Sequence, residues 1–281
     1  MPRPNFDTLI VEGGAMRGIF AAGVLDAFME QQFNPFNMLV GVSAGATNLI
    51  GFAANCPYRS KEVIGNLATS ANFVNPLRFL RGGHFCDVKW LWQQSMLQYP
   101  IEHHNLQLAS RPFYVVTTNI NTGAAQYHKV NEHNMDAVFE ASCALPLLYR
   151  AYPQVNNQAM TDGGIADSIP VKFAYQQGAR KILVIRSRPR DYRKRVATSS
   201  WLSDKLFVKQ QGLARAIRAR AENYNAACEF ISSPPDDCHI EDISPSTNFK
   251  VTRFTKSPKV LAQGYQEGKS SALNWLKKHH L

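Results

Sequence analysis

The stretch Met38-Leu-Val-Gly-Val-Ser-Ala-Gly45 predicts the fold class of this 281-residue chain. It begins as a short apolar strand, turns at a Gly-x-Ser-x-Gly pattern and continues at 46–54 as a helix of small residues. The same succession occurs earlier, where an apolar run at 9–11 meets Gly13-Gly-Ala-Met-Arg-Gly18 and residues 19–28 have the apolar spacing of a helix. Two such units within 55 residues predict an α/β protein whose sheet is covered by helices.

Segments further along the chain extend this sheet. Residues 113–118 and 124–130 flank Asn121-Thr-Gly123 as a hairpin, and the apolar run at 181–185 is typical of a buried strand. Residues 60–98 have helical patterns that are interrupted by proline and glycine pairs. We expect these interrupted helices to form a cap or side wall over the sheet.

The positive charge of the chain is concentrated in one segment. The net charge is 31 − 21 = +10, and residues 180–220 contain 13 basic and two acidic side chains. This segment therefore carries +11, and the other 240 residues sum to −1. We expect an α/β domain at 6–187 and a basic, mainly helical region at 188–281 that is packed on it or appended to it. Long helices are expected at 203–227 and 257–280.

Composition and termini exclude several classes of protein. The chain is 45% hydrophobic, 11% aromatic and 19% charged, which argues against a disordered, collagen-like or low-complexity protein. It contains no run of about 18 apolar residues that could span a membrane, and its N-terminus has no secretion signal. Its five cysteines are scattered without a Cys-x-x-Cys pair, which predicts reduced thiols rather than disulfides or a zinc site. We expect a cytoplasmic protein.

Ser43 has the sequence context of an activated nucleophile. Gly41 and Gly45 permit a strained turn from strand to helix, which would place the Ser43 hydroxyl at the sheet edge and at the N-terminus of a helix. The apolar strand before the turn and the small-residue helix after it are what this geometry requires. The alternative interpretation is a serine that caps a helix at a glycine-rich turn.

The segment that contains Gly13, Gly14 and Ala15 predicts an anion site. Successive small residues before a helix leave backbone amides free to converge on a phosphate or on the oxyanion of an acyl-transfer intermediate. A nucleotide loop would need Lys-Ser or Lys-Thr after Gly18, or an acidic residue about 20 positions later, and the chain has neither. We therefore expect an oxyanion hole. Arg17 either binds an anionic head group or holds the loop through hydrogen bonds.

The glycine turn Asp162-Gly163-Gly164 is the third motif. A carboxylate held there could accept the proton of Ser43 directly, because glycines permit a close approach. Its usual pKa of about 3.9 makes it a weak base, so burial and oxyanion stabilisation would have to compensate. The alternative is a plain β-turn. A conventional Ser-His-Asp triad would need His128 or His239 as its histidine.

Taken together and in this order, the three motifs resemble those of the patatin-like phospholipase family, a group of serine acyl hydrolases with bacterial members. The resemblance covers residues 9–171, and Ala141-Ser-Cys-Ala-Leu-Pro146 also looks like the helix end before the family's aspartate strand. It implies a mostly parallel sheet in a three-layer fold, a Ser43-Asp162 dyad, and the backbone amides of residues 13–15 as the oxyanion hole. The family usually has a third glycine where this chain has Ala15.

The resemblance implies a lipid acyl hydrolase of the phospholipase A type, with residues 6–187 as the catalytic domain. It would cleave carboxylic ester bonds without a cofactor or a metal. Two other functions stay open from the sequence: a lipid- or acyl-binding protein with little turnover, and a nucleic-acid-associated protein that uses residues 180–220. No recognised nucleic-acid module or pattern of aromatic and basic residues supports the second of these.

Residues 180–220 could bring such an enzyme to an anionic membrane. Apolar side chains at helical spacing lie among lysines and arginines there, and Tyr192 and Trp201 are candidate interfacial anchors. The apolar positions are Leu202, Leu206, Leu213 and Ile217. We expect peripheral contact with the inner face of the membrane. The alternative is a solvated helix that packs its apolar stripe on the core.

Overall fold

The two strand–turn–helix units predicted near the N-terminus form the centre of the sheet. The computed structural model describes residues 6–106, 108, 110–195 and 205–280. Strand β1 (Thr8–Val11) pairs in parallel with β2 (Met38–Val42). Each strand is followed by a glycine turn and a helix, α1 (Gly18–Glu30) after β1 and α2 (Ala44–Ala53) after β2.

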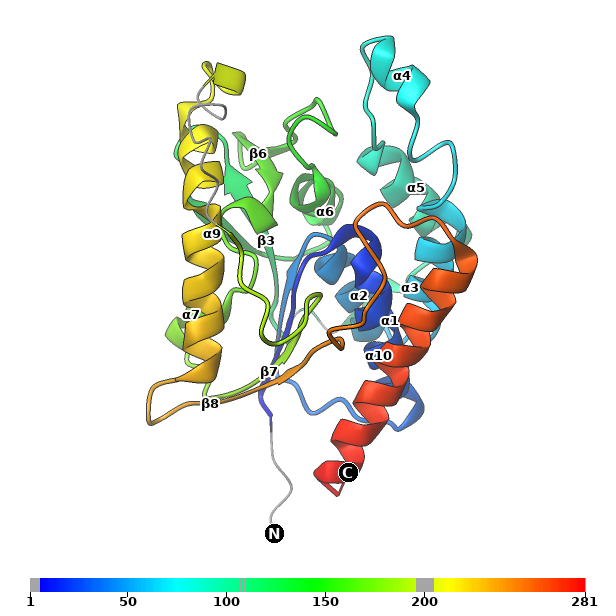
Figure 1. Ribbon diagram of the computed structural model, residues 1–281, viewed down its shortest axis with the longest axis vertical. Helices are drawn as coiled ribbons and strands as arrows, with labels where there is room; N and C mark the ends of the chain where they lie inside the picture. The colour runs from blue at the N-terminus through cyan, green and yellow to red at the C-terminus, as the bar shows by residue number, and fades with distance from the viewer. Residues whose placement is uncertain (1–5, 107, 109, 196–204, 281) are drawn as a thin grey trace.

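The result is an eight-stranded mixed sheet with helices on both faces (Figure 1). The strand order is β5-β6-β3-β2-β1-β7-β8, with β4 beside β3. The neighbours from β3 to β8 in this order are parallel, whereas β4, β5 and β6 are antiparallel to their partners. The other strands are β3 (Phe113–Asn119), β4 (Ala125–Lys129), β5 (Gln154–Val155), β6 (Gln158–Asp162), β7 (Lys181–Ile185) and β8 (His239–Ile243). The predicted α/β class with a mostly parallel central sheet is confirmed.

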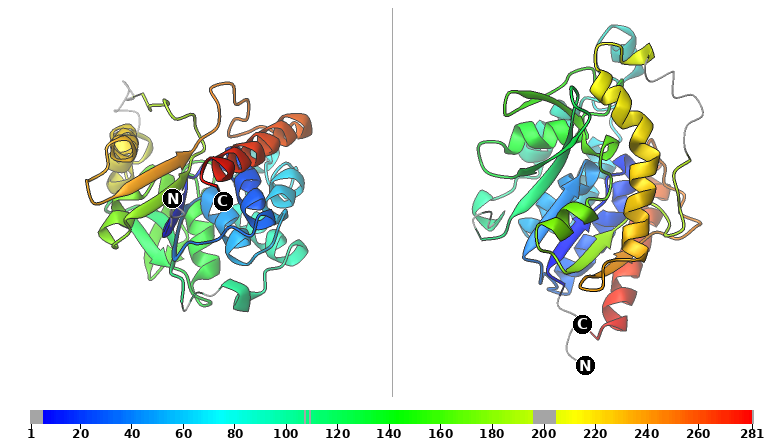
Figure 2. Two further views of the ribbon diagram at one scale, coloured as in Figure 1. Left: turned by 90° about the horizontal axis from the view of Figure 1, so that it is seen from below. Right: turned by 90° about the vertical axis from the view of Figure 1, so that its left-hand side faces the viewer.

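Helices of very different lengths cover this sheet. The structure contains α3 (Arg59–Glu62), α4 (Pro76–Leu80), α5 (Val88–Gln98), α6 (Met135–Cys143), α7 (Val171–Gln176), α9 (Gln211–Ser232) and α10 (Pro258–Lys278). A π-helical segment lies at Val63–Leu67, and 3₁₀ turns lie at Ala15–Arg17, His103–Leu106 and Gly163–Ile165. In Figures 1 and 2, α9 and α10 lie on opposite sides of the sheet.

Successive strand residues supply two apolar layers. Leu9 and Val11 pack in the cluster that contains residues of α1, α2, α6 and α10, whereas Ile10 packs with α7 and α9 on the other face. Leu183 and Val184 of β7 divide in the same way. Because side chains alternate along a strand, a continuous apolar run can fill both layers.

The C-terminal region joins the sheet as well as covering it. Strand β8, which the sequence patterns did not indicate, pairs in parallel with β7. Helix α9 begins at Gln211, later than predicted, because the Leu213 amide in its first turn donates to the Ile120 carbonyl (2.9 Å). Helix α10 matches the terminal helix predicted at 257–280 and packs on α1. The division of the chain after residue 187 stays a prediction.

Asp26 is a buried carboxyl that ties α1 to two other elements. It is 1% exposed, its Oδ2 accepts from the Tyr265 hydroxyl of α10 (2.8 Å), and its Oδ1 accepts from the Tyr58 amide before α3 (2.9 Å). Burial raises the pKa of this carboxyl, and the two hydrogen bonds oppose that shift. The ionised form therefore depends on both donors.

We predict that Tyr265→Phe lowers the free energy of unfolding by about 1–3 kcal/mol at neutral pH, because it leaves one oxygen of Asp26 buried without a partner. Loss of the donor raises the folded-state pKa of Asp26 further. The destabilisation should therefore grow as the pH rises through that pKa and shrink in acid, where Asp26 is protonated. Urea denaturation across pH measures it.

The matched control is Tyr175→Phe, which removes a hydroxyl that donates to the exposed Asp237 (2.8 Å). Water replaces that bond, so little change in stability is expected. Equal stability of the Tyr265→Phe variant and the unsubstituted protein at neutral pH would contradict the role given to Asp26.

Candidate functional site

Ser43 and Asp162 meet because β2 and β6 pair with the same edge of β3. In the register, Val42 at the end of β2 lies opposite Val116, and the next residue of β3, Thr117, lies opposite Asp162. Strand β4 occupies the other edge of β3 at this point. The parallel β2 and the antiparallel β6 thus approach each other along one edge, and the residue after β2 faces the last residue of β6.

Ser43 lies in the turn between β2 and α2 in a backbone conformation that residues with a Cβ rarely adopt, with φ 53° and ψ −128°. Its amide donates to the Ser142 hydroxyl (2.8 Å), which in turn donates to the Val116 carbonyl of β3 (2.7 Å). Gly45 is needed on the helix side, because a Cβ there would lie 2.3 Å from the Val11 carbonyl oxygen. The strained strand-to-helix turn that the motif predicts is formed and is anchored on the sheet.

Asp162 is 3% exposed, and its Oδ1 accepts a hydrogen bond from the Gly164 amide (2.7 Å). Burial raises the pKa of this carboxyl above its usual range, whereas a hydrogen bond from the Ser43 hydroxyl and the charge of Arg220 lower it. Gly163 lets the turn pass close to β3, since a Cβ there would lie 2.1 Å from a carbonyl oxygen of that strand. A carboxylate of raised pKa beside a hydroxyl is suited to accept its proton.

The loop after β1 lies against Ser43. A Cβ on Gly13 would be 3.1 Å from the Cβ of Ser43, so the two segments are in direct contact. Within the described part of the chain, no group accepts a hydrogen bond from the amides of residues 13–15. Free amides beside a nucleophile can receive an oxyanion. Ala15 has a φ of 50°, in the left-handed region that costs a non-glycine residue about 1–2 kcal/mol.

Arg17 holds this loop to Ser187, which lies two residues after the end of β7. Its Nε donates to the Ser187 carbonyl (3.2 Å) and its Nη2 donates to the Ser187 hydroxyl (3.4 Å), which itself donates to the Gly13 carbonyl (2.9 Å). The guanidinium is buried, which lowers the pKa of Arg17 to about 10. Its Nη1 has no partner among the described residues. Arg17 thus holds the loop through hydrogen bonds, which is one of the two roles considered for it, and its Nη1 group remains as a donor without an acceptor among the described residues.

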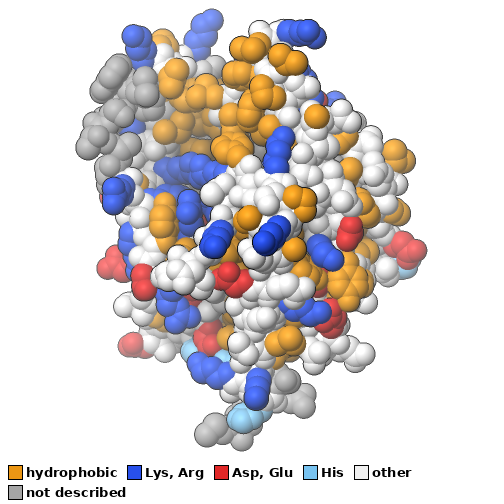
Figure 3. All heavy atoms as spheres, turned by 45° about the vertical axis from the view of Figure 1, so that its right-hand side comes forward, with side chains coloured by type: hydrophobic (Ala, Val, Ile, Leu, Met, Phe, Trp, Pro, Cys, Tyr) orange, Lys and Arg blue, Asp and Glu red, His pale blue; other side chains and the backbone are white. Residues whose placement is uncertain are grey.

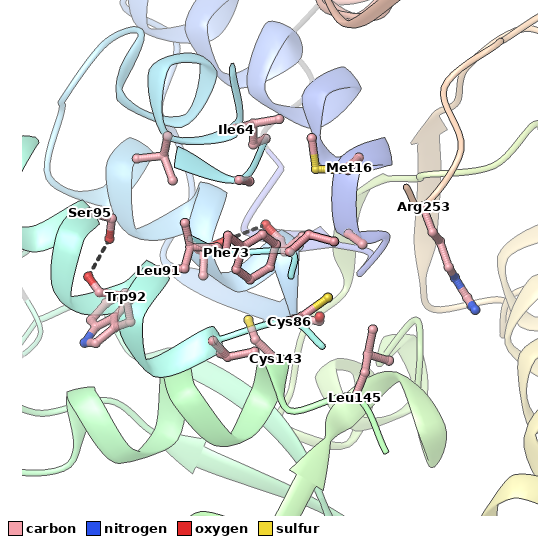
Figure 4. Close-up of a pocket in the computed structure, with 18 of the residues that line it drawn as sticks. Met16, Ile64, Phe73, Cys86, Leu91, Trp92, Ser95, Cys143, Leu145 and Arg253 are labelled. Atoms are coloured by element: carbon pink, nitrogen blue, oxygen red, sulfur yellow. Dashed lines mark hydrogen bonds between the residues drawn. The ribbon is translucent and has the colours of Figure 1, made fainter. Parts of the chain in front are cut away.

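Two cavities open from Ser43. The larger, about 120 Å³, is lined mainly by apolar side chains from α5, α6, the π-helical segment and the turns around them, and Figure 4 shows several of these side chains. They include Met16, Ile64, Phe73, Leu91, Trp92, Phe139 and Cys143. The smaller, about 40 Å³, is polar and lies on the side of Asp162 and α9. Ala15, Ser43, Leu145 and Arg253 line both cavities, so the two meet at Ser43.

Neither histidine considered for a triad reaches Ser43. His128 on β4 forms a hydrogen bond with Thr117 (2.8 Å), and His239 on β8 forms one with Glu241 (3.1 Å). Neither lines a cavity at Ser43. Among the residues that the structure describes, no three histidine, cysteine or acidic side chains are grouped to hold a metal ion. None of the described helices is long and apolar enough to cross a membrane.

Several polar side chains at the site were not assigned a role there from the sequence, among them Ser142, Lys194, Arg220 and Arg253. Ser142 belongs to the 141–146 segment, which stood out only by resemblance. Lys194 and Arg220 belong to the basic segment, and Arg253 lies outside it in the loop between β8 and α10. No periodicity links these residues, because only the packing of α9 and of that loop brings them together.

The apolar stripe of the basic segment packs partly on the core. Leu213 is fully buried, Ile217 packs on the same cluster, and Leu206 is half exposed. Tyr192 packs edge-on against Tyr224, with ring centres 5.8 Å apart, instead of projecting from the surface. Trp201 and Leu202 lie outside the described residues. Leu213 and Ile217 therefore pack on the core, as the alternative interpretation of the apolar stripe expected.

We predict that Ser142→Ala slows the reaction of Ser43 with a fluorophosphonate probe, because the Ser43 amide loses the partner that holds its strained backbone. The buried Ser142 hydroxyl also satisfies the Val116 carbonyl, so the free energy of unfolding should fall by about 1–3 kcal/mol. Labelling rates of the folded protein and urea denaturation measure the two effects.

The control is Ser232→Ala, which removes a hydroxyl that donates to a backbone carbonyl at the C-terminal end of α9 (2.9 Å). It should label at the rate of the unsubstituted protein. A normal labelling rate in the Ser142→Ala protein would show that other contacts position Ser43.

Comparisons with known proteins show the family and the fold of this chain. A family model described as patatin-like phospholipase matches residues 9–175, and a second, described as a domain of unknown function (DUF6363), matches residues 210–280. The uncharacterized protein YjjU of Escherichia coli (strain K12) is 34% identical over 276 residues, which cover 95% of this chain and 76% of YjjU. The crystal structure of VipD from Legionella pneumophila has a TM-score of 0.54 at 15% identity and covers 98% of this chain and 67% of VipD, so the two share a fold.

The first family model spans more than half of the chain and contains all three motifs that the sequence singled out. The relative that is 34% identical extends the similarity into the C-terminal region. This chain belongs to the patatin-like phospholipase family.

Proposed function

We propose that this chain is a serine lipid acyl hydrolase of the phospholipase A type, which cleaves carboxylic ester bonds through Ser43 and Asp162. Membership of the family supports hydrolysis of lipid esters. The observation that carries the assignment is the meeting of a serine hydroxyl, a buried carboxylate and free backbone amides at the mouth of an apolar cavity. Each of the three parts supplies one requirement of acyl transfer.

In the first half-reaction the Ser43 oxygen attacks the ester carbonyl carbon while its proton passes to Asp162. The carbonyl oxygen becomes an oxyanion and is held by the amides of residues 13–15. The intermediate collapses by breaking the bond to the alcohol oxygen, which leaves with the proton from Asp162. The acyl group remains on Ser43.

In the second half-reaction water attacks the acyl-enzyme and gives a proton to Asp162. A second oxyanion forms on the same amides and collapses, the proton returns to the Ser43 oxygen, and the fatty acid leaves. No cofactor or metal takes part in these steps. The base acts without an intervening histidine, which is consistent with the lining of both cavities, where none of the described residues is a histidine.

The larger cavity is suited to the acyl chain of the substrate. Its walls are mainly apolar, and it begins at Ser43, where the ester carbonyl must lie. Burying an alkyl chain contributes about 0.8 kcal/mol for each methylene group, so the cavity favours long acyl chains over short ones.

Peripheral contact with an anionic membrane is part of the proposal. Helix α4 and the residues before α9 lie at the same end of the molecule (Figures 1 and 2), and hydrophobic and basic side chains gather at that end in Figure 3. Leu77 and Leu80 on α4 are 64% and 80% exposed, and Val208 is 65% exposed between two exposed basic side chains, Lys205 and Lys209. Such a surface matches the lipid headgroup region.

We predict that Ser43→Ala and Asp162→Asn each reduce the hydrolysis of a long-chain acyl ester by at least about a thousandfold, because each removes a proton-transfer partner of the reaction. In the unsubstituted protein, kcat/KM should fall as the pH drops through the raised pKa of Asp162, since only the carboxylate accepts a proton. Initial rates across pH measure both effects.

Two results distinguish lost chemistry from lost structure. Burial raises the folded-state pKa of Asp162, so its ionisation costs stability as the pH rises through that value, and Asp162→Asn should be at least as stable as the unsubstituted protein at neutral pH. Asp167→Asn, which alters a half-buried carboxyl of raised pKa that lines neither cavity, should keep its activity. No fluorophosphonate labelling of Ser43 in an intact fold would favour the lipid-binding alternative.

We predict that Leu77→Asp combined with Leu80→Asp weakens binding to vesicles of phosphatidylglycerol and phosphatidylcholine by at least about tenfold, because charged side chains cannot enter the headgroup region. Sedimentation with the vesicles measures binding. Leu273→Asp is the control, because that exposed residue lies near the C-terminal end of α10, at the opposite end of the molecule (Figure 1).

Binding to vesicles that is insensitive to the α4 substitutions would remove this surface from the proposal. Steeply salt-dependent binding to DNA, with no affinity for anionic vesicles, would favour the nucleic-acid alternative for residues 180–220 instead.

A further inference from the structure

The smaller cavity at Ser43 carries an excess of positive charge. Five cationic and two carboxylate side chains line it, so its formal charge is 5 − 2 = +3. The cations are Arg17, Arg188, Lys194, Arg220 and Arg253, and the carboxylates are Glu12 and Asp162. In the described part of the chain, none of the five cations forms an ion pair with a carboxylate. Unpaired cations packed this closely raise the free energy of the folded protein.

Lys194 is fixed in place by hydrogen bonds and not by an ion pair. Its backbone amide and carbonyl both bond to the Asn225 side chain of α9, at 2.8 and 3.0 Å. Its Nζ donates to the Ser168 hydroxyl (3.0 Å) and lies 4.0 Å from the ring centre of Tyr224. Burial lowers the pKa of Lys194 to about 7, and neighbouring Arg220 acts in the same direction. An anion in the cavity would stabilise the charged ammonium group.

Arg220 and Arg253 aim at the same space from different elements. Arg220 on α9 donates through Nε to the Gly164 carbonyl (2.8 Å), two residues after Asp162, and its pKa is lowered by burial and then by Arg253. Arg253, in the loop between β8 and α10, lines both cavities. Figure 4 shows it at the side of the cavity, away from Phe73 and Leu91.

Arg17 provides an independent sign that a ligand belongs here. Its side chain is 4% exposed, and its buried Nη1 has no hydrogen-bond partner in the described chain. A buried donor without an acceptor costs about 1–3 kcal/mol, so native proteins rarely leave one unless an unseen ligand or water accepts from it. The charge of Glu12 acts on Arg17, but Glu12 accepts through Oε2 from the Ser187 amide (2.8 Å).

We propose that this cavity binds the phosphate group of the substrate, on the alcohol side of the ester that Ser43 attacks. Arg17, Lys194 and Arg220 bind the phosphate oxygens, and Arg253 closes the junction with the acyl cavity. The inference rests on the proposed function and deepens it, because it selects phosphate-bearing acyl esters over neutral glycerides. A cavity of about 40 Å³ has room for about three water-sized groups, enough for the free oxygens of a phosphate.

The placement of the cations supports this specificity. Lys194, Arg220 and Arg253 belong to the C-terminal region, whereas Ser43 and Asp162 belong to the segment that the patatin-like model matches. Glu12 and Asp162 are the two carboxylates of the cavity, each accepts a hydrogen bond from a backbone amide, and the five cations outnumber them. The cavity therefore favours a head group with a net negative charge.

The test compares two ligands that differ only in the phosphate, 1-octanoylglycerol 3-phosphate and 1-octanoylglycerol. Calorimetric titration uses the full-length Ser43→Ala protein, so that binding is measured without turnover. The phosphate ligand is expected to bind at least about tenfold more tightly. Adding Arg220→Gln or Lys194→Met should each reduce this ratio about tenfold, since each removes charge-assisted hydrogen bonds to the phosphate.

The matched control is Arg215→Gln, which removes the same charge from an exposed position of α9 outside both cavities. It should leave the ratio unchanged, which excludes a general effect of net charge. Equal binding of the two ligands, or a ratio that neither Arg220→Gln nor Lys194→Met lowers, would overturn the proposal. Inorganic phosphate that binds as tightly as the acyl phosphate would also overturn it, because the cavity would then be a site for a free anion.

Turnover of the same two esters by the unsubstituted protein separates this inference from the function on which it rests. Preferential hydrolysis of the phosphate ester supports both. Hydrolysis of both esters with the same kcat/KM would overturn the inference and keep the hydrolase. Phosphate-dependent binding without hydrolysis of either ester would overturn the hydrolase while supporting the phosphate site.

Discussion

The pairing of one edge of β3, first with β2 and then with β6, is the constraint on which the site depends. It makes the end of a parallel strand face the end of an antiparallel one, and the two proposed proton-transfer partners are the residues at these ends. The same strand also anchors the strained turn, because Ser142 connects the Ser43 amide to the Val116 carbonyl. The position of the serine and that of the carboxylate are therefore both set by hydrogen bonds to β3.

Burial then determines the electrostatics of the site. It raises the pKa of Asp162, which suits a proton acceptor, and it lowers that of Lys194 to about 7, where the neighbouring arginines act in the same direction and the Glu12 carboxylate opposes them only in part. The site is also divided by origin: the apolar cavity is built mainly from residues 15–149, whereas the cations of the polar cavity come largely from the C-terminal region. At Ser43, an apolar cavity from the α/β part of the chain thus meets a basic cavity whose cations come largely from the C-terminal region, and the site is amphipathic.

Elements with a local pattern were predictable, and those stabilised by distant partners were not. The strand–turn–helix units, the β3–β4 hairpin, β7 and α10 have apolar periodicity or turn residues of their own. Strand β8 contains Glu241 and Asp242, which accept from Trp275 on α10 (2.8 Å) and pair with Arg190 (2.8 Å), so its charges are satisfied only in the folded protein. The start of α9 depends likewise on a hydrogen bond to the Ile120 carbonyl. Because Ile120 lies far from residues 203–227 in the sequence, no pattern within those residues indicates this contact.

The amino-acid sequence by itself determined the α/β class, the places of the three glycine turns and the candidates Ser43 and Asp162, since spacing and residue type along a short stretch of chain are sufficient for these. It also located the positive charge at 180–220. Only the tertiary structure decided that Ser43 faces Asp162, that Ser142 supports the turn, and that Lys194 and Arg220 meet Arg17 and Arg253 in one cavity. The physical reason is that strand register along β3 and the packing of α9 join residues more than a hundred positions apart, and no local pattern carries that information.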